Sequence, residues 1–76
     1  MGGLDHTSGD LLYEQLAQIL RSDIASGKIT GRLPSARDLA DQYEVSHATS
    51  EKSLRILAGE GLIRSVHGKG FYVVKR

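Results

Sequence analysis

The feature of this chain that most constrains its fold is the succession of helix caps and turns between Leu33 and Val74. Pro34 keeps a helix from extending backward, and Ser35 followed by Asp38 forms a capping-box-like helix start. The apolar pattern breaks before Ser46, which can cap a second helix after only a few residues. Two short helices with so short a connection are typical of a helix-turn-helix.

The second of these helices is expected to run from about His47 to Gly59. With 3.6 residues per turn, one of its faces must point into the core, and that face carries Ser50, Ser53, Leu54 and Leu57. The opposite, outward face carries His47, Ala48, Glu51, Lys52 and Arg55. A serine in the core needs a hydrogen-bond partner, so we expect Ser50 to bond to the carbonyl one turn earlier.

After Gly61, two β-prone runs at 62–66 and 71–74 flank the sequence His67-Gly68-Lys69-Gly70. The glycines permit the positive φ angles of a hairpin turn. An isolated hairpin is only marginally stable, so this one must pack on the helices.

Apolar residues also recur at three- and four-residue spacing from about Asp10 to Ser26, namely Leu12, Leu16, Ile19, Leu20 and Ile24. This spacing predicts an amphipathic helix, interpreted mainly as a scaffold that covers the core, with Gly27 as its C-terminal cap. Residues 1–9 contain three glycines and no apolar periodicity, and we expect a flexible arm there.

The expected architecture is therefore α+β and mainly α. Residues 10–76 are predicted to form a winged helix-turn-helix with three helices and a two- or three-stranded β wing. The helix-turn-helix covers about 36–55 and the wing about 62–74.

Charge is distributed unevenly, although the net charge is only +1. Residues 62–76 contain Arg64, Lys69, Lys75 and Arg76 and no acid, whereas acids outnumber bases in the rest of the chain. Local positive charge suits phosphate contacts, because the field near a surface matters more than the total charge. The alternative is that a basic end simply keeps a small domain in solution.

Several other classes of function have little support in these 76 residues. The chain has no cysteine, and His6, His47 and His67 are widely spaced, so we expect no disulfide, metal site or cofactor. No apolar run approaches the roughly 18 residues that suggest a membrane helix, and the N-terminus does not resemble a signal peptide. Nucleophile-elbow, phosphate-loop and paired-acid patterns are absent, so we do not expect an enzyme.

Three strings of this chain resemble the GntR family of bacterial transcriptional regulators: Leu33 to Ser46, Leu54 to Ile63 and Gly68 to Val73. Leu12 to Leu16 and Ile24 to Gly27 resemble the first helix of that family. The resemblance implies a winged-helix domain that binds palindromic operators in double-stranded DNA as a homodimer, in the bacterial cytoplasm and commonly as a repressor. It also implies a separate C-terminal effector domain, which has no counterpart here. We expect an excised DNA-binding part of a longer regulator, or else a naturally short member.

The expected helix faces and the resemblance together define a candidate DNA interface, made of Ser35, Arg37, Ser46, His47, Ala48, Thr49, Glu51, Lys52, Arg55, His67, Gly68 and Lys69. Arg37 matches a family residue that contacts DNA, and a cation at a helix N-terminus opposes the macrodipole, which favours a role outside folding. Its alternative is a solvated side chain or one paired with Asp41.

Other candidate residues also have alternatives. Ser46 could act only as a cap, and Glu51 could pair with Arg55 one turn later instead of contacting a base. The tip at His67 and Gly68 matches the family's wing, which enters or skirts the minor groove, and its alternative is an ordinary hairpin turn.

The expected recognition face departs from the family pattern at three positions. The family usually has arginine where this chain has His47 and Glu51, and a hydrophobic residue where it has Ser50. Arginine favours guanine, whereas glutamate can accept a hydrogen bond from the amino group of cytosine. We therefore expect an operator that differs from the family's guanine-centred sites. A winged-helix module that binds another protein remains the alternative function, and its response to DNA would be weak and insensitive to salt.

Overall fold

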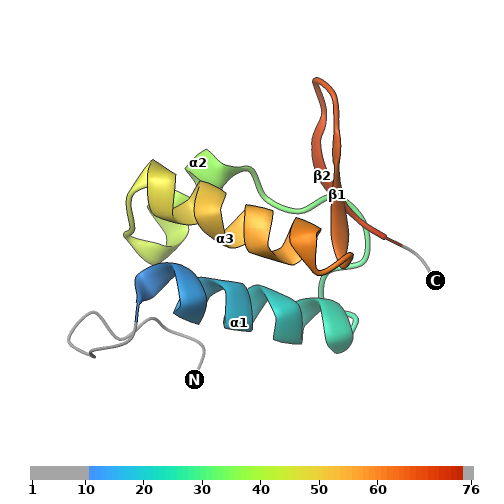
Figure 1. The fold of residues 1–76 in the computed structure, drawn as a ribbon, viewed down its shortest axis with the longest axis horizontal. Coiled ribbons are helices and arrows are strands. Elements are labelled where there is room, and N and C mark those ends of the chain that lie inside the picture. The colour runs from blue at the N-terminus through green and yellow to red at the C-terminus, as the bar shows by residue number, and fades with distance from the viewer. Residues whose placement is uncertain (1–10, 75–76) are drawn as a thin grey trace.

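The computed structural model describes residues 11–74. Over these residues it contains three helices, α1 (Leu12–Ala25), α2 (Ala36–Tyr43) and α3 (His47–Gly59), followed by the strands β1 (Ile63–Val66) and β2 (Gly70–Val73) (Figure 1). This is the predicted mainly helical winged helix-turn-helix. The predicted flexible arm, residues 1–9, and the basic end, Lys75 and Arg76, lie outside the described residues.

Serine caps set the starts of α2 and α3 as the sequence predicts. The Ser35 hydroxyl accepts a hydrogen bond from the Asp38 amide at 3.0 Å, and the Ser46 hydroxyl accepts one from the Thr49 amide at 3.0 Å. Between the helices, Glu44 adopts a left-handed conformation with φ of 57° and ends α2. The result is a tight turn that directs α3 across α2.

Helix α3 lies between α1 and α2 and packs against both of them and against β1 (Figure 1). Each helix contributes leucine to the core, whose buried cluster consists of Leu16, Leu20, Leu33, Leu39, Leu54, Leu57 and Ile63. In α1 the buried stripe is narrower than predicted, because Leu12, Ile19 and Ile24 are only half-buried. Ala17, which the periodicity did not single out, is 1% exposed.

Two serines are completely buried on the inward face of α3. Ser50 donates a hydrogen bond to the Ser46 carbonyl at 3.4 Å, which confirms the expected bond to the preceding turn. The Ser53 hydroxyl lies 2.7 Å from the Tyr13 carbonyl oxygen and 3.1 Å from that of Thr49. The bond from Ser53 to Tyr13 links α3 to α1.

Strands β1 and β2 are antiparallel, with Arg64 opposite Tyr72 and Ser65 opposite Phe71. A third segment joins the sheet, because Arg32 forms an antiparallel bridge with Tyr72. The Leu33 amide donates to the Phe71 carbonyl and the Val73 amide to the Gly31 carbonyl, both at 2.9 Å. The connector before α2 therefore lies along β2 and is joined to it by this single bridge, while the sheet itself has two strands. No helix within residues 11–74 is long and apolar enough to cross a membrane.

Candidate nucleic-acid interface

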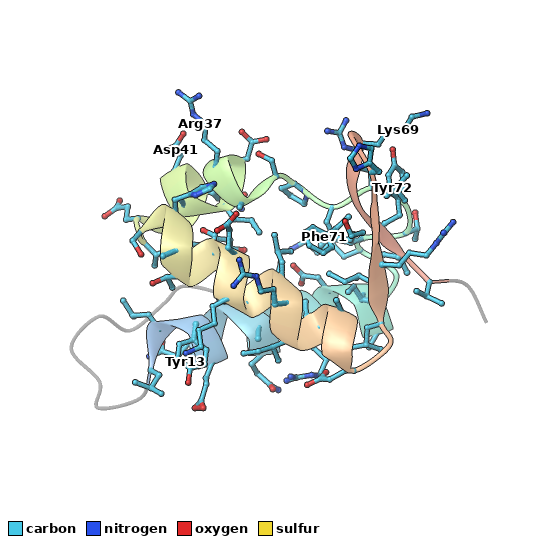
Figure 2. The ribbon with its side chains drawn as sticks, turned by 45° about the horizontal axis from the view of Figure 1, so that its top comes forward. Tyr13, Arg37, Asp41, Lys69, Phe71 and Tyr72 are labelled. Atoms are coloured by element: carbon cyan, nitrogen blue, oxygen red, sulfur yellow. The ribbon has the colours of Figure 1, made fainter. Side chains whose placement is uncertain are left out.

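The N-terminal end of α2 presents Arg37 to solvent. Its side chain and that of Asp41 project from α2 toward the same side of the molecule as the hairpin tip (Figure 2). Within residues 11–74 Arg37 forms no ion pair, so the predicted alternative of pairing with Asp41 is not what the structure contains. Arg37 is exposed, and so is the capping residue Ser35 two positions before it.

The first turn of α3 is held by Ser46. Its hydroxyl accepts from the Thr49 amide and also donates to the Thr49 Oγ1 at 2.9 Å. Ser46 is therefore a cap, and its further contact with DNA stays a prediction. Thr49 is half-buried, whereas His47 and Ala48 are exposed at the N-terminal end of the helix. This turn presents one imidazole and one methyl group outward.

The next turn of α3 carries a loose ion pair. Arg55 Nη2 lies 3.8 Å from Glu51 Oε1, and the side chains are 75% and 45% exposed. A pair this long and this exposed stabilises a helix only weakly, because water screens it and both side chains stay mobile. The structure thus contains the predicted competitor for Glu51, and a DNA contact could displace it at small cost.

Lys52 has a partner that the sequence analysis did not predict. Its Nζ lies 4.1 Å from the centre of the Tyr13 ring, which is the geometry of a cation–π interaction. Tyr13 comes from the N-terminal end of α1, where it is labelled in Figure 2. No periodicity could have linked these residues, because their proximity depends on how α1 packs against α3. The interaction holds an ammonium group at the edge of the outward face of α3.

The hairpin tip carries His67, Gly68 and Lys69, all exposed. Gly68 has a φ of 73°, and the Lys69 amide closes the turn by donating to the Val66 carbonyl at 2.9 Å. Helix α2 and the hairpin tip project to the same side of the molecule, over opposite ends of α3 (Figure 1). The predicted residues thus come from the start of α2, the outward face of α3 and the tip of the wing.

A shallow groove runs along the hairpin and has a volume of about 730 Å³. Its lining includes Arg64, Lys69 and Tyr72 together with Thr30 and Gly31 of the connector. Of this set, only Lys69 was predicted to be a site residue. The signal that could have drawn attention to Arg64 was the excess of basic residues in the segment 62–76.

Helices joined by a tight turn and followed by a hairpin with a basic tip define the winged helix-turn-helix class of regulatory domains. The family of bacterial regulatory proteins named gntR matches residues 12–73. The chain belongs to this GntR family.

Similar proteins agree with that assignment. The chain is 35% identical over 75 residues to the probable fructoselysine utilization operon transcriptional repressor of Escherichia coli (strain K12), covering 96% of this chain and 31% of that protein. YtrA from Sulfolobus acidocaldarius, a GntR-family transcription factor, has a TM-score of 0.86 and 31% identity, with 96% of this chain and 79% of that one covered. The DNA-binding domain of AraR in complex with operator ORE1 has a TM-score of 0.82 and 32% identity, with 97% and 93% covered.

This chain spans between 16% and 31% of the length of curated regulators that it matches. The similarity therefore covers only part of those proteins.

Proposed function

We propose that this chain is the operator-binding domain of a bacterial transcriptional repressor. The observation that carries the proposal is the arrangement of three predicted parts of the interface. Arg37 of α2 and the wing tip lie on the same side of the molecule, and the outward face of α3 is open to solvent. The family assignment supports it, and so does the similarity to a domain that binds an operator.

In this proposal α3 enters the major groove and the wing tip lies at the minor groove. Arg37 and the first turn of α2 position the domain by contacting phosphates, because such contacts set orientation without specifying sequence. His47, Ala48 and Glu51 face the base edges. Lys52 and Arg55 flank them, with Lys52 directed by the ring of Tyr13.

A homodimer on a palindromic operator is part of the same proposal. Helix-turn-helix dimers contact half-sites about one helical turn apart, so two copies of this domain would be held at that spacing. The family resemblance supports the dimer and a location with the DNA in the bacterial cytoplasm. In a longer regulator, a second domain would bind the small-molecule effector.

Selection from a random pool of DNA duplexes, followed by an amide NMR titration with the enriched duplex, tests this proposal. We expect one sequence class to be enriched, with shifts concentrated in residues 35–55 and 66–70 and affinity falling steeply with salt. Unmoved amides in these two ranges at low salt would contradict the proposal. Weak binding that is insensitive to salt would instead indicate a protein-interaction module.

A further inference from the structure

The wing sheet has two chemically different faces. Side chains alternate along a strand, and residues paired across strands share a face. Phe71 and Ile63 pack on the core side. Tyr72 instead points away from the helices, as Figure 2 shows.

The outward face carries an aromatic residue between two arginines. Tyr72 pairs with Arg64 of β1 on one side and with Arg32 of the connector on the other. Backbone hydrogen bonds lie on either side of the Arg32–Tyr72 pair, so the two residues form a non-hydrogen-bonded antiparallel pair. In such a pair the Cα atoms are about 4.5 Å apart and the side chains are close. Both arginines are exposed, and Tyr72 is half-buried. We call Arg32, Tyr72 and Arg64 the wing row.

The wing row is continuous with the wing tip. Arg32 Nε lies 3.7 Å, and its Nη2 3.9 Å, from the position that a Cβ atom would occupy on Gly70. The guanidinium thus extends along the hairpin toward the turn that holds Lys69. Lys69 itself lines the groove together with Arg64 and Tyr72. Residues 62–76 contain no acid that could neutralise this surface.

We propose that the wing row is a second DNA contact surface, which binds the phosphates that flank the groove entered by the wing tip. The proposal rests on the proposed function. Guanidinium groups bind phosphate through paired hydrogen bonds, and a tyrosine hydroxyl can donate to it as well. Because the row faces away from α3, it meets the DNA backbone and not the base edges that α3 contacts. Charge complementarity and continuity with the wing tip favour DNA over an acidic protein segment.

Salt dependence of DNA binding tests this inference, since each neutralised phosphate contributes about 0.9 to the slope of log K against log salt. The probe is a random-sequence duplex of about 30 base pairs, long enough for two half-sites one turn apart. We expect Arg32→Gln and Arg64→Gln each to reduce the slope by about 0.9, and to weaken binding about fivefold to tenfold at 0.1 M salt, for each copy of the domain bound to the duplex. The double variant should show the sum of both changes.

Two controls accompany these variants. Lys28→Gln removes an exposed cation from the turn that follows α1 and should leave the slope unchanged. Helix α1 and the hairpin tip lie on opposite sides of the molecule (Figure 1). Arg32→Lys keeps the charge and should restore the slope lost in Arg32→Gln. Base preference in the selected pool should be the same for all variants, because phosphate contacts carry no sequence information.

The outcomes separate this inference from the proposed function. A steep slope for the unaltered chain that persists in the Arg32→Gln, Arg64→Gln double variant would overturn the wing row as a DNA surface and leave the proposed function standing. Equal losses in Lys28→Gln would also overturn it, because the effect would then be one of net charge alone. Failure of the unaltered chain to bind any duplex would contradict both.

Discussion

Glu51 occupies a position on the outward face of α3 where the family usually has arginine, and its carboxylate is only loosely engaged by Arg55. A carboxylate in the major groove can accept a hydrogen bond from cytosine but repels phosphate. In the proposed complex, Glu51 is therefore expected to lower affinity for DNA in general and to favour sites with cytosine opposite it.

Replacing Glu51 by arginine is expected to strengthen nonspecific binding and to move base preference toward guanine at one position, by about 1 to 3 kcal/mol of discrimination. Selection of bound duplexes from a random pool measures the preference. Glu51→Gln is the matched control, because it removes the negative charge without adding a guanidinium. An unchanged base preference in Glu51→Arg would show that Glu51 does not face the bases.

At the scale of elements, the two faces of α3 have different requirements. Its inward face must pack between α1 and α2, and its outward face must stay polar. Ser50 and Ser53 meet the first demand although they are polar, because each hydroxyl bonds to a backbone carbonyl. The exposed N-terminal end of the helix depends on Ser46. Its hydroxyl accepts a hydrogen bond from the Thr49 amide, which would otherwise have no partner within the helix.

Ser46→Ala should lower the free energy of unfolding by about 1 kcal/mol, because it removes the cap of α3. For a domain of this size that corresponds to a fall in Tm of roughly 4 to 8 °C. Thermal and urea unfolding measure the change. Ser65→Ala, at an exposed position in β1, is the control and should have little effect. Equal stability of Ser46→Ala and the unaltered chain would mean that the cap seen in the structure contributes nothing.

Across the whole molecule, a bidentate ion pair joins elements far apart in sequence. Arg21 of α1 donates to Glu60, just after α3, through Nε at 2.9 Å and Nη2 at 2.7 Å. The hydrogen bond from Arg21 lowers the pKa of the Glu60 carboxyl below its ordinary value of 4.5. The pair lies at the end of α3 away from its first turn, so it bears on stability and not on the proposed DNA contacts.

A lowered carboxyl pKa in the folded state contributes stability that is present above the unfolded-state pKa and is lost as pH falls through the folded-state pKa. Glu60→Gln should therefore be less stable than the unaltered chain at pH 7, and the difference should shrink below the ordinary pKa of 4.5. Urea unfolding across this pH range measures it. The difference is expected to be small, because both side chains are more than a third exposed to the screening of water. A difference in the free energy of unfolding between the two proteins that stays constant with pH would contradict the lowered pKa of Glu60.

The fold of this chain follows closely from local signals. Ser35 and Ser46 cap helices where predicted, and α3 begins at His47 and ends at Gly59 as expected. Such features can be predicted from the sequence because capping, helical periodicity and glycine turns depend on a few neighbouring residues. The faces of α3 follow from the same periodicity, so the bonded, buried Ser50 was predictable as well.

Contacts between distant segments required the tertiary structure. The Tyr13–Lys52 interaction and the bridge from Arg32 to Tyr72 join residues on separate elements, and the bond from Ser53 to the Tyr13 carbonyl does the same. No local pattern encodes them, because they depend on how closely α1 approaches α3 and on which connector closes the edge of the sheet. The amino-acid sequence by itself determined which helices and strands form and which faces are apolar. Only the packing of those elements decided that a connector arginine would lie beside the wing, where the proposed second DNA surface is.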